Sequence, residues 1–181
     1  VLWALGPGRA QSTNLWLVLY CRMDGSFRAQ CHAACMDIWF NTRRRVLCAN
    51  DYFPKCEPTG SCRAQVFMSS TSEGSESARL MYLLSIASAA RSIRIASAYF
   101  IPDDLSVRTL ADSRRRGVTV DIVVPGSHVD TACTRRPGRS GWGPLLESGV
   151  ELYEYVPTMY QVKVMIVAEL WPSCRSAHFA N

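Results

Sequence analysis

The chain has 181 residues and a formal net charge of +5, and 48% of its residues are hydrophobic. This length suits one compact domain with its own core, and the composition excludes an intrinsically disordered chain. The basic balance favours anionic partners such as lipid headgroups, phosphodiesters or nucleic acid. The arginines gather in three short runs, at 43–45, 114–116 and 135–136. Each run by itself is more typical of a solvated helix end or loop.

The eight cysteines include no Cys-x-x-Cys pair, and no histidine lies at zinc-finger spacing. The chain is too long and too rich in core residues for a small disulfide scaffold, which favours free thiols in a reducing compartment. Its most apolar early run, residues 15–20, is too short to span a bilayer. No signal peptide can be recognised at the start. We therefore expect no transmembrane segment in this chain, and fragment boundaries at both ends.

The first part of the chain carries weak patterns. Residues 1–20 show only a turn signal at Gly6-Pro7-Gly8 and stay unassigned. Apolar residues at steps of three and four predict a helix over residues 29–43. Prolines and a glycine predict a loop over 50–61, and alternation predicts a strand over 63–68.

The second part reads as strands alternating with helices. The clearest helix covers residues 76–91, where Leu80, Leu83, Leu84 and Ala87 share an apolar face. The elements expected after it are a strand at 93–99, a helix from Pro102 to Gly117, a strand at 118–124, a short helix ended by Gly149, and strands at 150–155 and 163–167. This alternation predicts an α/β layered domain with a largely parallel or mixed sheet.

Several blocks occur in an order that resembles the C-terminal half of bacterial cardiolipin synthases, in the phospholipase D superfamily. The blocks are Met36-Asp37-Ile38-Trp39, Asp51-Tyr52-Phe53-Pro54, Gly74-Ser75-Glu76-Ser77, Ala98-Tyr99-Phe100-Ile101-Pro102-Asp103-Asp104, Leu145-Leu146-Glu147-Ser148-Gly149-Val150 and Pro157-Thr158-Met159. The resemblance covers residues 21–181. It implies a phospholipase D-like lobe, a mixed β-sheet flanked by helices, that is truncated at both ends.

The family signature is His-x-Lys, four residues and Asp, followed by Gly-Ser-x-Asn. Residues two apart on a strand face the same side, so the His and Lys of such a motif both reach one phosphate. The resemblance implies two lobes that share one active site. One histidine attacks phosphorus to form a phosphohistidine, and the other protonates the leaving alcohol. Lysines and backbone amides stabilise the phosphoryl oxygens. This chemistry needs no metal and no cofactor.

In this chain four of the six signature residues are replaced. Gln161 stands at the His position, Lys163 is retained, and Ala168 stands at the Asp position. The second segment contains Arg175 for Gly, the retained Ser176, and His178 for Asn. Glutamine has no group that titrates near neutral pH, so it is neither a phosphorus nucleophile nor a general acid. We therefore expect a lobe that is inactive alone, with Lys163 and Ser176 as the surviving catalytic-motif residues.

Other candidate residues carry two interpretations each. His178 substitutes for the missing imidazole or is an ordinary residue at a strand end. Tyr99 and Phe100 end a strand, where α/β folds bind ligands, and they either line a lipid site or pack in the core. Asp130 supports the pocket or caps a helix. Arg175 either blocks close approach of the backbone to a phosphate or adds a phosphate contact.

The resemblance implies an anionic phospholipid, a membrane surface and a second phospholipase D-like lobe, in cis or trans, as partners. It implies a location at the bacterial inner membrane, facing the cytoplasm or peripheral. The function that follows is a phosphatidyltransferase or phosphodiesterase lobe with a degenerate motif. Its alternatives are a non-catalytic remnant that binds anionic phospholipid and a decayed reading of a once active gene. A nucleic-acid partner is not expected, because the basic runs define no single stripe.

Overall fold

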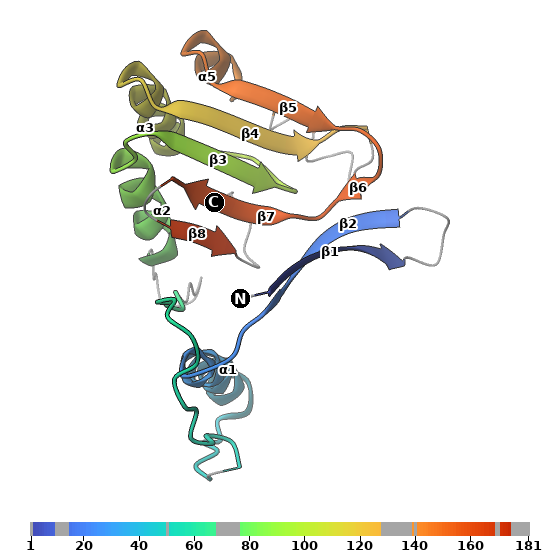
Figure 1. Cartoon of the computed structure of the whole chain (residues 1–181), viewed down its shortest axis with the longest axis vertical. Helices are drawn as coiled ribbons and strands as arrows, with labels where there is room; N and C mark the ends of the chain where they lie inside the picture. Colours follow the sequence, from blue (N-terminus) through green and yellow to red (C-terminus); the bar gives the residue numbers. More distant parts are fainter. Residues whose placement is uncertain are drawn as a thin grey trace. The chain divides into compact units, whose positions relative to one another are not determined.

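The computed structural model describes residues 2–9, 15–49, 51–67, 77–127, 139, 141–168 and 171–174 (Figure 1). The chain divides into two compact units. One holds residues 1–3 and 21–79, and the other holds residues 4–20 and 80–181. In the described part of the chain, no helix is both long enough and apolar enough to cross a bilayer.

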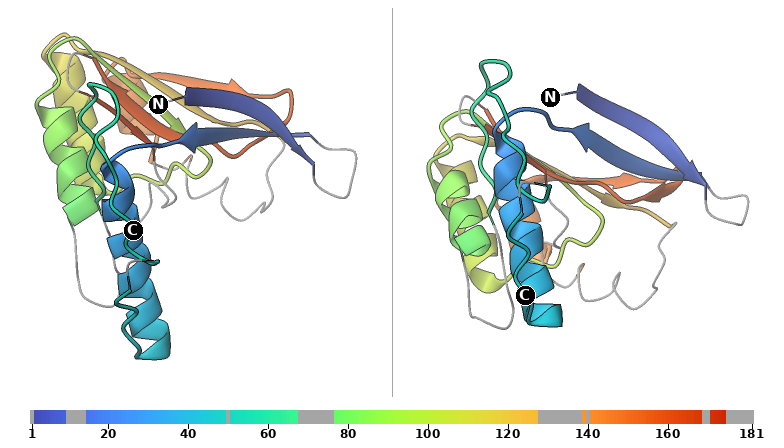
Figure 2. Two further views of the ribbon diagram at one scale, coloured as in Figure 1. Left: turned by 60° about the horizontal axis from the view of Figure 1, so that its bottom comes forward. Right: turned by 90° about the horizontal axis from the view of Figure 1, so that it is seen from below.

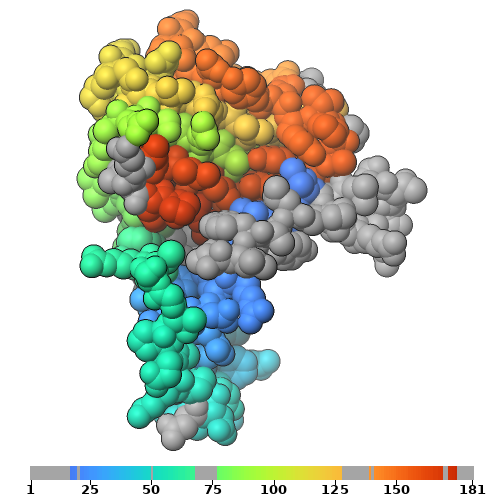
Figure 3. Space-filling model, viewed as in Figure 1, coloured from blue at the N-terminus to red at the C-terminus, as the bar shows by residue number. Residues whose placement is uncertain are grey.

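The smaller unit consists of helix α1, Phe27–Arg43, and a long loop beside it (Figures 2 and 3). The loop is held by a hydrogen bond from the backbone N–H of Val66 to Oε1 of Gln30, at 2.9 Å. None of the residues of α1 is buried. The helix predicted over 29–43 is confirmed. The strand predicted over 63–68 is wrong for residues 63–67, which are irregular, and Val66 gives its N–H to a side chain rather than to a neighbouring strand.

The larger unit contains a five-stranded sheet with the order β5-β4-β3-β7-β8 (Figure 1). Strands β3 (Ser92–Ser97), β4 (Thr119–Pro125) and β5 (Glu151–Tyr155) are parallel to one another. Strands β7 (Lys163–Val167) and β8 (Trp171–Cys174) are antiparallel additions beside β3. The mixed sheet expected from the sequence is therefore confirmed.

A second, three-stranded sheet has the order β1-β2-β6. It consists of β1 (Leu2–Arg9), β2 (Leu15–Arg22) and the short β6 (Met159–Tyr160), which is parallel to β2. Strand β1 and all but the last two residues of β2 lie in the segment that the sequence left unassigned. Glycine and proline weaken the strand signal, which explains why Gly6-Pro7-Gly8 inside β1 reads as a turn.

Helices α2 (Ser77–Ala87), α3 (Asp104–Arg115) and α5 (Gly143–Glu147) cover one face of the five-stranded sheet (Figure 2). The core between these layers contains side chains from every one of them, including the fully buried Ile86, Ile93, Leu110, Ile122 and Leu145. The burial of each side chain of this size stabilises the folded state by about 1.5–3 kcal/mol. Asp103 caps α3 by accepting a hydrogen bond from the N–H of Ser106 at 2.7 Å, which fits the acidic helix start expected there.

Helix α2 presents to the core a different face from the one its leucines suggest. Leu84 is 66% exposed, whereas Ile86 is fully buried. The buried face also carries polar groups with partners on β8: the hydroxyl of Tyr82 lies 3.1 Å from that of Ser173, and Trp171 donates to the Ser85 hydroxyl at 3.2 Å. The stripe of leucines leaves out Tyr82, Ser85 and Ile86, which are the buried residues of α2, so it selects the wrong face of this helix.

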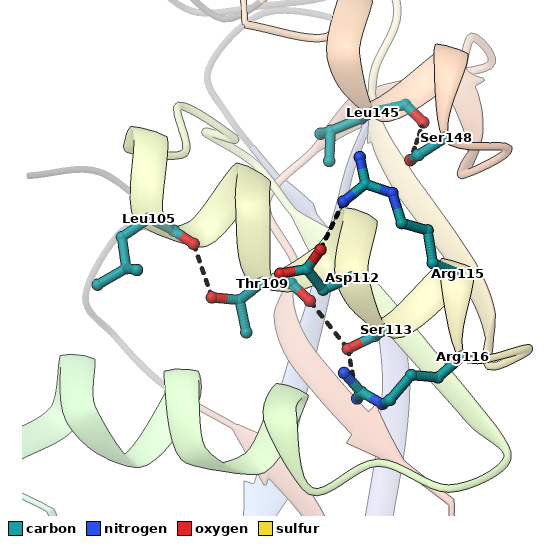
Figure 4. Close-up of polar contacts among 8 residues, drawn as sticks. All are labelled: Leu105, Thr109, Asp112, Ser113, Arg115, Arg116, Leu145 and Ser148. Carbon is teal, nitrogen blue, oxygen red and sulfur yellow. Dashed lines mark hydrogen bonds and ion pairs between the residues drawn. The ribbon is translucent and has the colours of Figure 1, made fainter.

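The arginine run at 114–116 ties helix ends together. Arg114 donates to the carbonyl of Gly149 at 2.8 Å, and Arg116 donates to the carbonyl of Ala87 at 2.9 Å. Arg116 also binds the Ser113 hydroxyl, and Arg115 pairs with Asp112 at 2.6 Å (Figure 4). Unpaired carbonyls at the ends of helices are satisfied by such side chains. This run is therefore a structural feature of the amino edge of the sheet.

The buried face of α2 can be tested by substitution. Ile86→Ala removes a fully buried side chain, so it should lower the free energy of unfolding by about 2–5 kcal/mol. Leu84 lies on the exposed face of the same helix, so Leu84→Ala should change the free energy of unfolding by less than about 0.5 kcal/mol. Urea unfolding followed by circular dichroism measures both. Similar losses for the two variants would contradict the observed packing of α2.

Candidate functional site

Four strands of the five-stranded sheet begin or end at one edge, and three of them have a polar or aromatic residue there. The parallel strands β3, β4 and β5 end there with Ser97, Pro125 and Tyr155. Because β7 is antiparallel to β3, it begins at this same edge with Lys163. Ligands of open α/β sheets bind outside the carboxyl ends of the parallel strands. We refer to this edge as the carboxyl edge.

Lys163 is held at the carboxyl edge by the ladder between β3 and β7. It pairs directly with Ser97, and the N–H of Ala98 donates to the carbonyl of Val162 at 2.9 Å. Ser97 is buried, and its hydroxyl donates to the carbonyl of Tyr99 at 2.9 Å, which fixes the turn that leaves β3. Side chains of directly opposed residues in an antiparallel pair lie on one face. The Lys163 side chain therefore shares its face with Ser97.

Gln161 reaches the same edge from the other sheet. Its N–H donates to the carbonyl of Leu17 on β2 at 2.9 Å, and its side chain is partly exposed. Val162, between Gln161 and Lys163, is buried. The period of two along an extended chain thus puts the Gln161 and Lys163 side chains on one side. The structure brings these two predicted site residues together.

Ala168 lies at the opposite end of β7. Its N–H donates to the carbonyl of Ser92, the first residue of β3, at 2.9 Å. It lies five positions after Lys163 along the extended chain, a distance of about 16 Å at the usual rise per residue. A side chain at position 168 therefore does not reach the carboxyl edge.

The remaining predicted residues differ in what the structure describes. Tyr99 follows β3 at the carboxyl edge and is partly exposed. Phe100 is buried within the core cluster. Of the two interpretations given for it above, packing in the core is therefore the one observed. Four predicted residues lie outside the described part of the chain: Asp130, Arg175, Ser176 and His178.

The chain enters two of these undescribed segments from the carboxyl edge. Strand β8 ends at Cys174, which pairs with Val164, the residue after Lys163. Strand β4 ends at Pro125, where the N–H of Gly126 donates to the carbonyl of Tyr155 at 2.8 Å. A Cβ on Gly126 would lie 2.9 Å from that carbonyl oxygen, so only glycine allows this close approach of the β4 and β5 ends.

Tyr160, which the sequence did not single out, lies directly before Gln161. It is buried, and its ring centroid lies 5.1 Å from that of Tyr155 at the end of β5. Burial, with a smaller contribution from Tyr155, raises the pKa of Tyr160 to about 12. Its phenol is therefore neutral over the physiological range. From the sequence alone, a tyrosine in this position is assigned to the core. No pattern therefore marked Tyr160 as a residue of the carboxyl edge.

The described residues at this edge include a group that can bind an anion. Among the described residues, no group of three or more His, Cys, Asp or Glu side chains could hold a metal ion. The lysine ammonium is a point charge that suits phosphate. Gln161 offers amide donors and an acceptor, but no group that exchanges a proton at neutral pH.

Comparisons with known proteins agree on one family. A family model described as "Cardiolipin synthase, PLD-like domain" matches residues 82–176, more than half of the chain. "Probable cardiolipin synthase YwiE" of Bacillus subtilis is 30% identical over 155 residues, which are 85% of this chain and 31% of that protein. Cardiolipin synthase 2 of Bacillus anthracis is 38% identical over 92 residues, which are 51% of this chain and 18% of that protein. The chain thus spans about a third or less of the length of these relatives.

A solved structure supports the same fold. The phospholipase D family member Nuc from Salmonella typhimurium superposes with a TM-score of 0.50 and 28% sequence identity. The match covers 60% of this chain and 69% of Nuc. A phospholipase D-like lobe, expected from the sequence, is therefore confirmed.

The protonation of Tyr160 predicts a loss of stability in alkali. An unfolded tyrosine loses its proton near pH 10, whereas folded Tyr160 keeps its proton up to a pKa of about 12. Between these values the unfolded chain binds fewer protons than the folded chain, so the free energy of unfolding falls as pH rises. Tyr160→Phe should remove this part of the fall. Urea midpoints at about pH 9 and about pH 11 measure it, and an equal fall in both proteins would contradict the assignment.

Proposed function

Because this chain belongs to the phospholipase D-like domain family of cardiolipin synthases, we propose that it is a phospholipid-binding lobe without the family's covalent chemistry. It holds the phosphate of an anionic phospholipid at the carboxyl edge, and it does not turn that phosphodiester over by itself. The observation that carries the proposal is the location of Lys163 and Gln161 together at the beginning of β7.

Phosphate binding is supported by the groups around Lys163. The ammonium supplies a positive charge, and the buried Ser97 opposite it fixes the end of β3. Charge-assisted hydrogen bonds to phosphate are stronger than neutral ones. Ser176 and Arg175 follow Cys174, which ends β8 beside the strand position next to Lys163. We propose that they complete the phosphate contacts, and that Asp130 borders the same pocket after β4.

The loss of turnover follows from Gln161. In the family, a histidine at this position attacks phosphorus or protonates the leaving alcohol. Glutamine does neither, because its amide is not nucleophilic and does not titrate near neutral pH. Removal of a covalent nucleophile typically costs several orders of magnitude in rate. His178, also outside the described residues, is the one remaining imidazole near the motif in the sequence.

The partners in this proposal are an anionic phospholipid, a membrane surface and a second phospholipase D-like lobe. The chain spans 31% of the Bacillus subtilis relative, so the second lobe lies in the remainder of such a protein or in another chain. The proposed location is the inner face of a bacterial membrane.

Binding can be tested on the chain as it is. Lys163→Gln removes one charged contact to phosphate, worth about 1.5–3 kcal/mol, so it should weaken binding of a soluble short-chain phosphatidylglycerol by at least about tenfold. Isothermal titration calorimetry measures the dissociation constant. The control is Lys55→Gln, which removes the same charge from an exposed loop position of the smaller unit. Equal effects of both substitutions would argue against a site at Lys163.

Turnover is tested by rebuilding the motif. The chain as it is should show no hydrolysis of a chromogenic phosphodiester or of phosphatidylglycerol vesicles above background. A variant with Gln161→His, Arg175→Gly and His178→Asn should gain turnover when the rest of the Bacillus subtilis relative is supplied in trans. Adding Ala168→Asp should leave that rate unchanged within about twofold, because position 168 lies about 16 Å from Lys163 along β7.

Each outcome of this experiment is informative, provided that circular dichroism shows folded variants. Turnover by the unmodified chain would contradict the proposed inactivity, and His178→Asn would then test the substitute histidine. A rebuilt motif that stays silent with the second lobe present would contradict the proposed role of Gln161. A large gain from Ala168→Asp would contradict the placement of that residue.

A further inference from the structure

The end of helix α1 exposes an unusual density of large apolar side chains. Ile38 is 67% exposed, Trp39 is 40% exposed and Phe40 is 41% exposed. All nine residues from 38 to 46 are exposed, and they include a further aliphatic side chain, Val46. We refer to residues 38–46 as the basic–aromatic tip. A soluble surface seldom gathers this much apolar area without a partner for it.

Three consecutive arginines lie within the same tip. The Arg43 guanidinium lies 5.9 Å from the centre of the Trp39 ring, and that of Arg44 lies 6.0 Å from the centre of the Phe40 ring. Arg44 adopts the left-handed conformation, with φ of 52°, and its N–H donates to the carbonyl of Phe40 at 2.7 Å. This bond ends the helix and keeps the arginines beside the rings.

The tip has a net charge of +3, because the nearest acidic residues in the sequence are Asp37 and Asp51, outside it. Its charge therefore complements a strongly anionic surface. The other described arginine run differs: Arg114 and Arg116 bind backbone carbonyls and Arg115 pairs with Asp112. Of these two runs, only 43–45 combines exposed aromatic rings with arginines that form no ion pair among the described residues.

We propose that the basic–aromatic tip docks on the surface of a bilayer that contains anionic phospholipid. Aromatic rings favour the headgroup level, where one side is apolar and the other is wet. Arginines stacked on those rings keep their charge toward lipid phosphates while their stems cover apolar area. Ile38 and Val46 add aliphatic contact with the acyl boundary. This docking surface uses only residues 38–46, the end of α1 and the three residues that follow it, and does not rest on the phosphate site at Lys163.

The test uses the full chain and sedimented vesicles of phosphatidylglycerol and phosphatidylcholine in equal parts, with pure phosphatidylcholine vesicles as the comparison. Each arginine near an anionic surface contributes about 1 kcal/mol. The triple variant Arg43→Gln, Arg44→Gln, Arg45→Gln should therefore bind the mixed vesicles about 100-fold more weakly. The matched control is Arg28→Gln, Lys55→Gln, Arg63→Gln, which removes the same charge from exposed positions of the same unit. It should lose less than about fivefold.

Two further measurements test the proposal even if the triple variant does not fold. Binding of the unmodified chain should fall steeply between about 0.05 and 0.5 M salt, and Trp39→Ala with Phe40→Ala should weaken binding at both salt concentrations. Equal binding to the two kinds of vesicle would overturn the proposal, as would equal losses in the triple variant and its control. Self-association that depends on Trp39 and Phe40, without vesicle binding, would also overturn it by identifying a protein partner. The triple arginine variant should keep its affinity for soluble short-chain phosphatidylglycerol within about twofold of the unmodified chain, which separates this docking surface from the phosphate site.

Discussion

Strand β7 runs antiparallel to β3, whereas β4 runs parallel to β3 on its other side. This one reversal decides where the motif residues lie. A parallel β7 would carry Lys163 to the amino edge of the sheet, away from the ends of β3, β4 and β5. The antiparallel pairing instead joins Lys163 to Ser97 and makes the start of β7 part of the carboxyl edge. The candidate site is therefore a consequence of strand direction as much as of residue identity.

The same pairing is also the centre of the core. Ile93 and Ile95 of β3 pair with Val167 and Met165 of β7, and all four are buried. These pairs put apolar side chains under the helices along most of β7 and leave its first residue at the edge. Packing thus fixes the register, and the register fixes Lys163: a slip of one residue would move every core side chain of β7 to the opposite face.

Sequence patterns predicted much of this arrangement. The short apolar run 163–167 gave β7 with its observed bounds, and the acids after Pro102 gave the start of α3. The ordered resemblance indicated the family, and it identified Gln161 and Lys163 as neighbouring positions of the family motif. The patterns failed where side chains serve two purposes. Tyr82 and Ser85 carry hydroxyl groups and are nevertheless buried, because β8 provides hydrogen-bond partners for them.

Other failures have equally physical causes. Strand β1 contains Gly6-Pro7-Gly8, residues that local propensity assigns to turns, so only pairing with another strand could reveal it. Ser97 and Tyr160 owe their places at the edge to strand pairing with residues far away in the sequence, Lys163 and Leu17. The separation of Ala168 from Lys163, by contrast, could have been worked out beforehand, because five extended residues span about 16 Å.

The arginine bonds at the amino edge have a consequence for how such a chain changes over evolutionary time. Arg114 and Arg116 secure the ends of α5 and α2 through backbone carbonyls, and these ties share no atoms with the residues around Lys163. The bonds that stabilise the helix ends and the residues of the candidate site thus lie at opposite edges of one sheet. An exchange of histidine for glutamine at position 161 would leave those ties untouched. A lobe built in this way can drift out of catalysis while its fold remains under independent selection, and it stays available for a binding role.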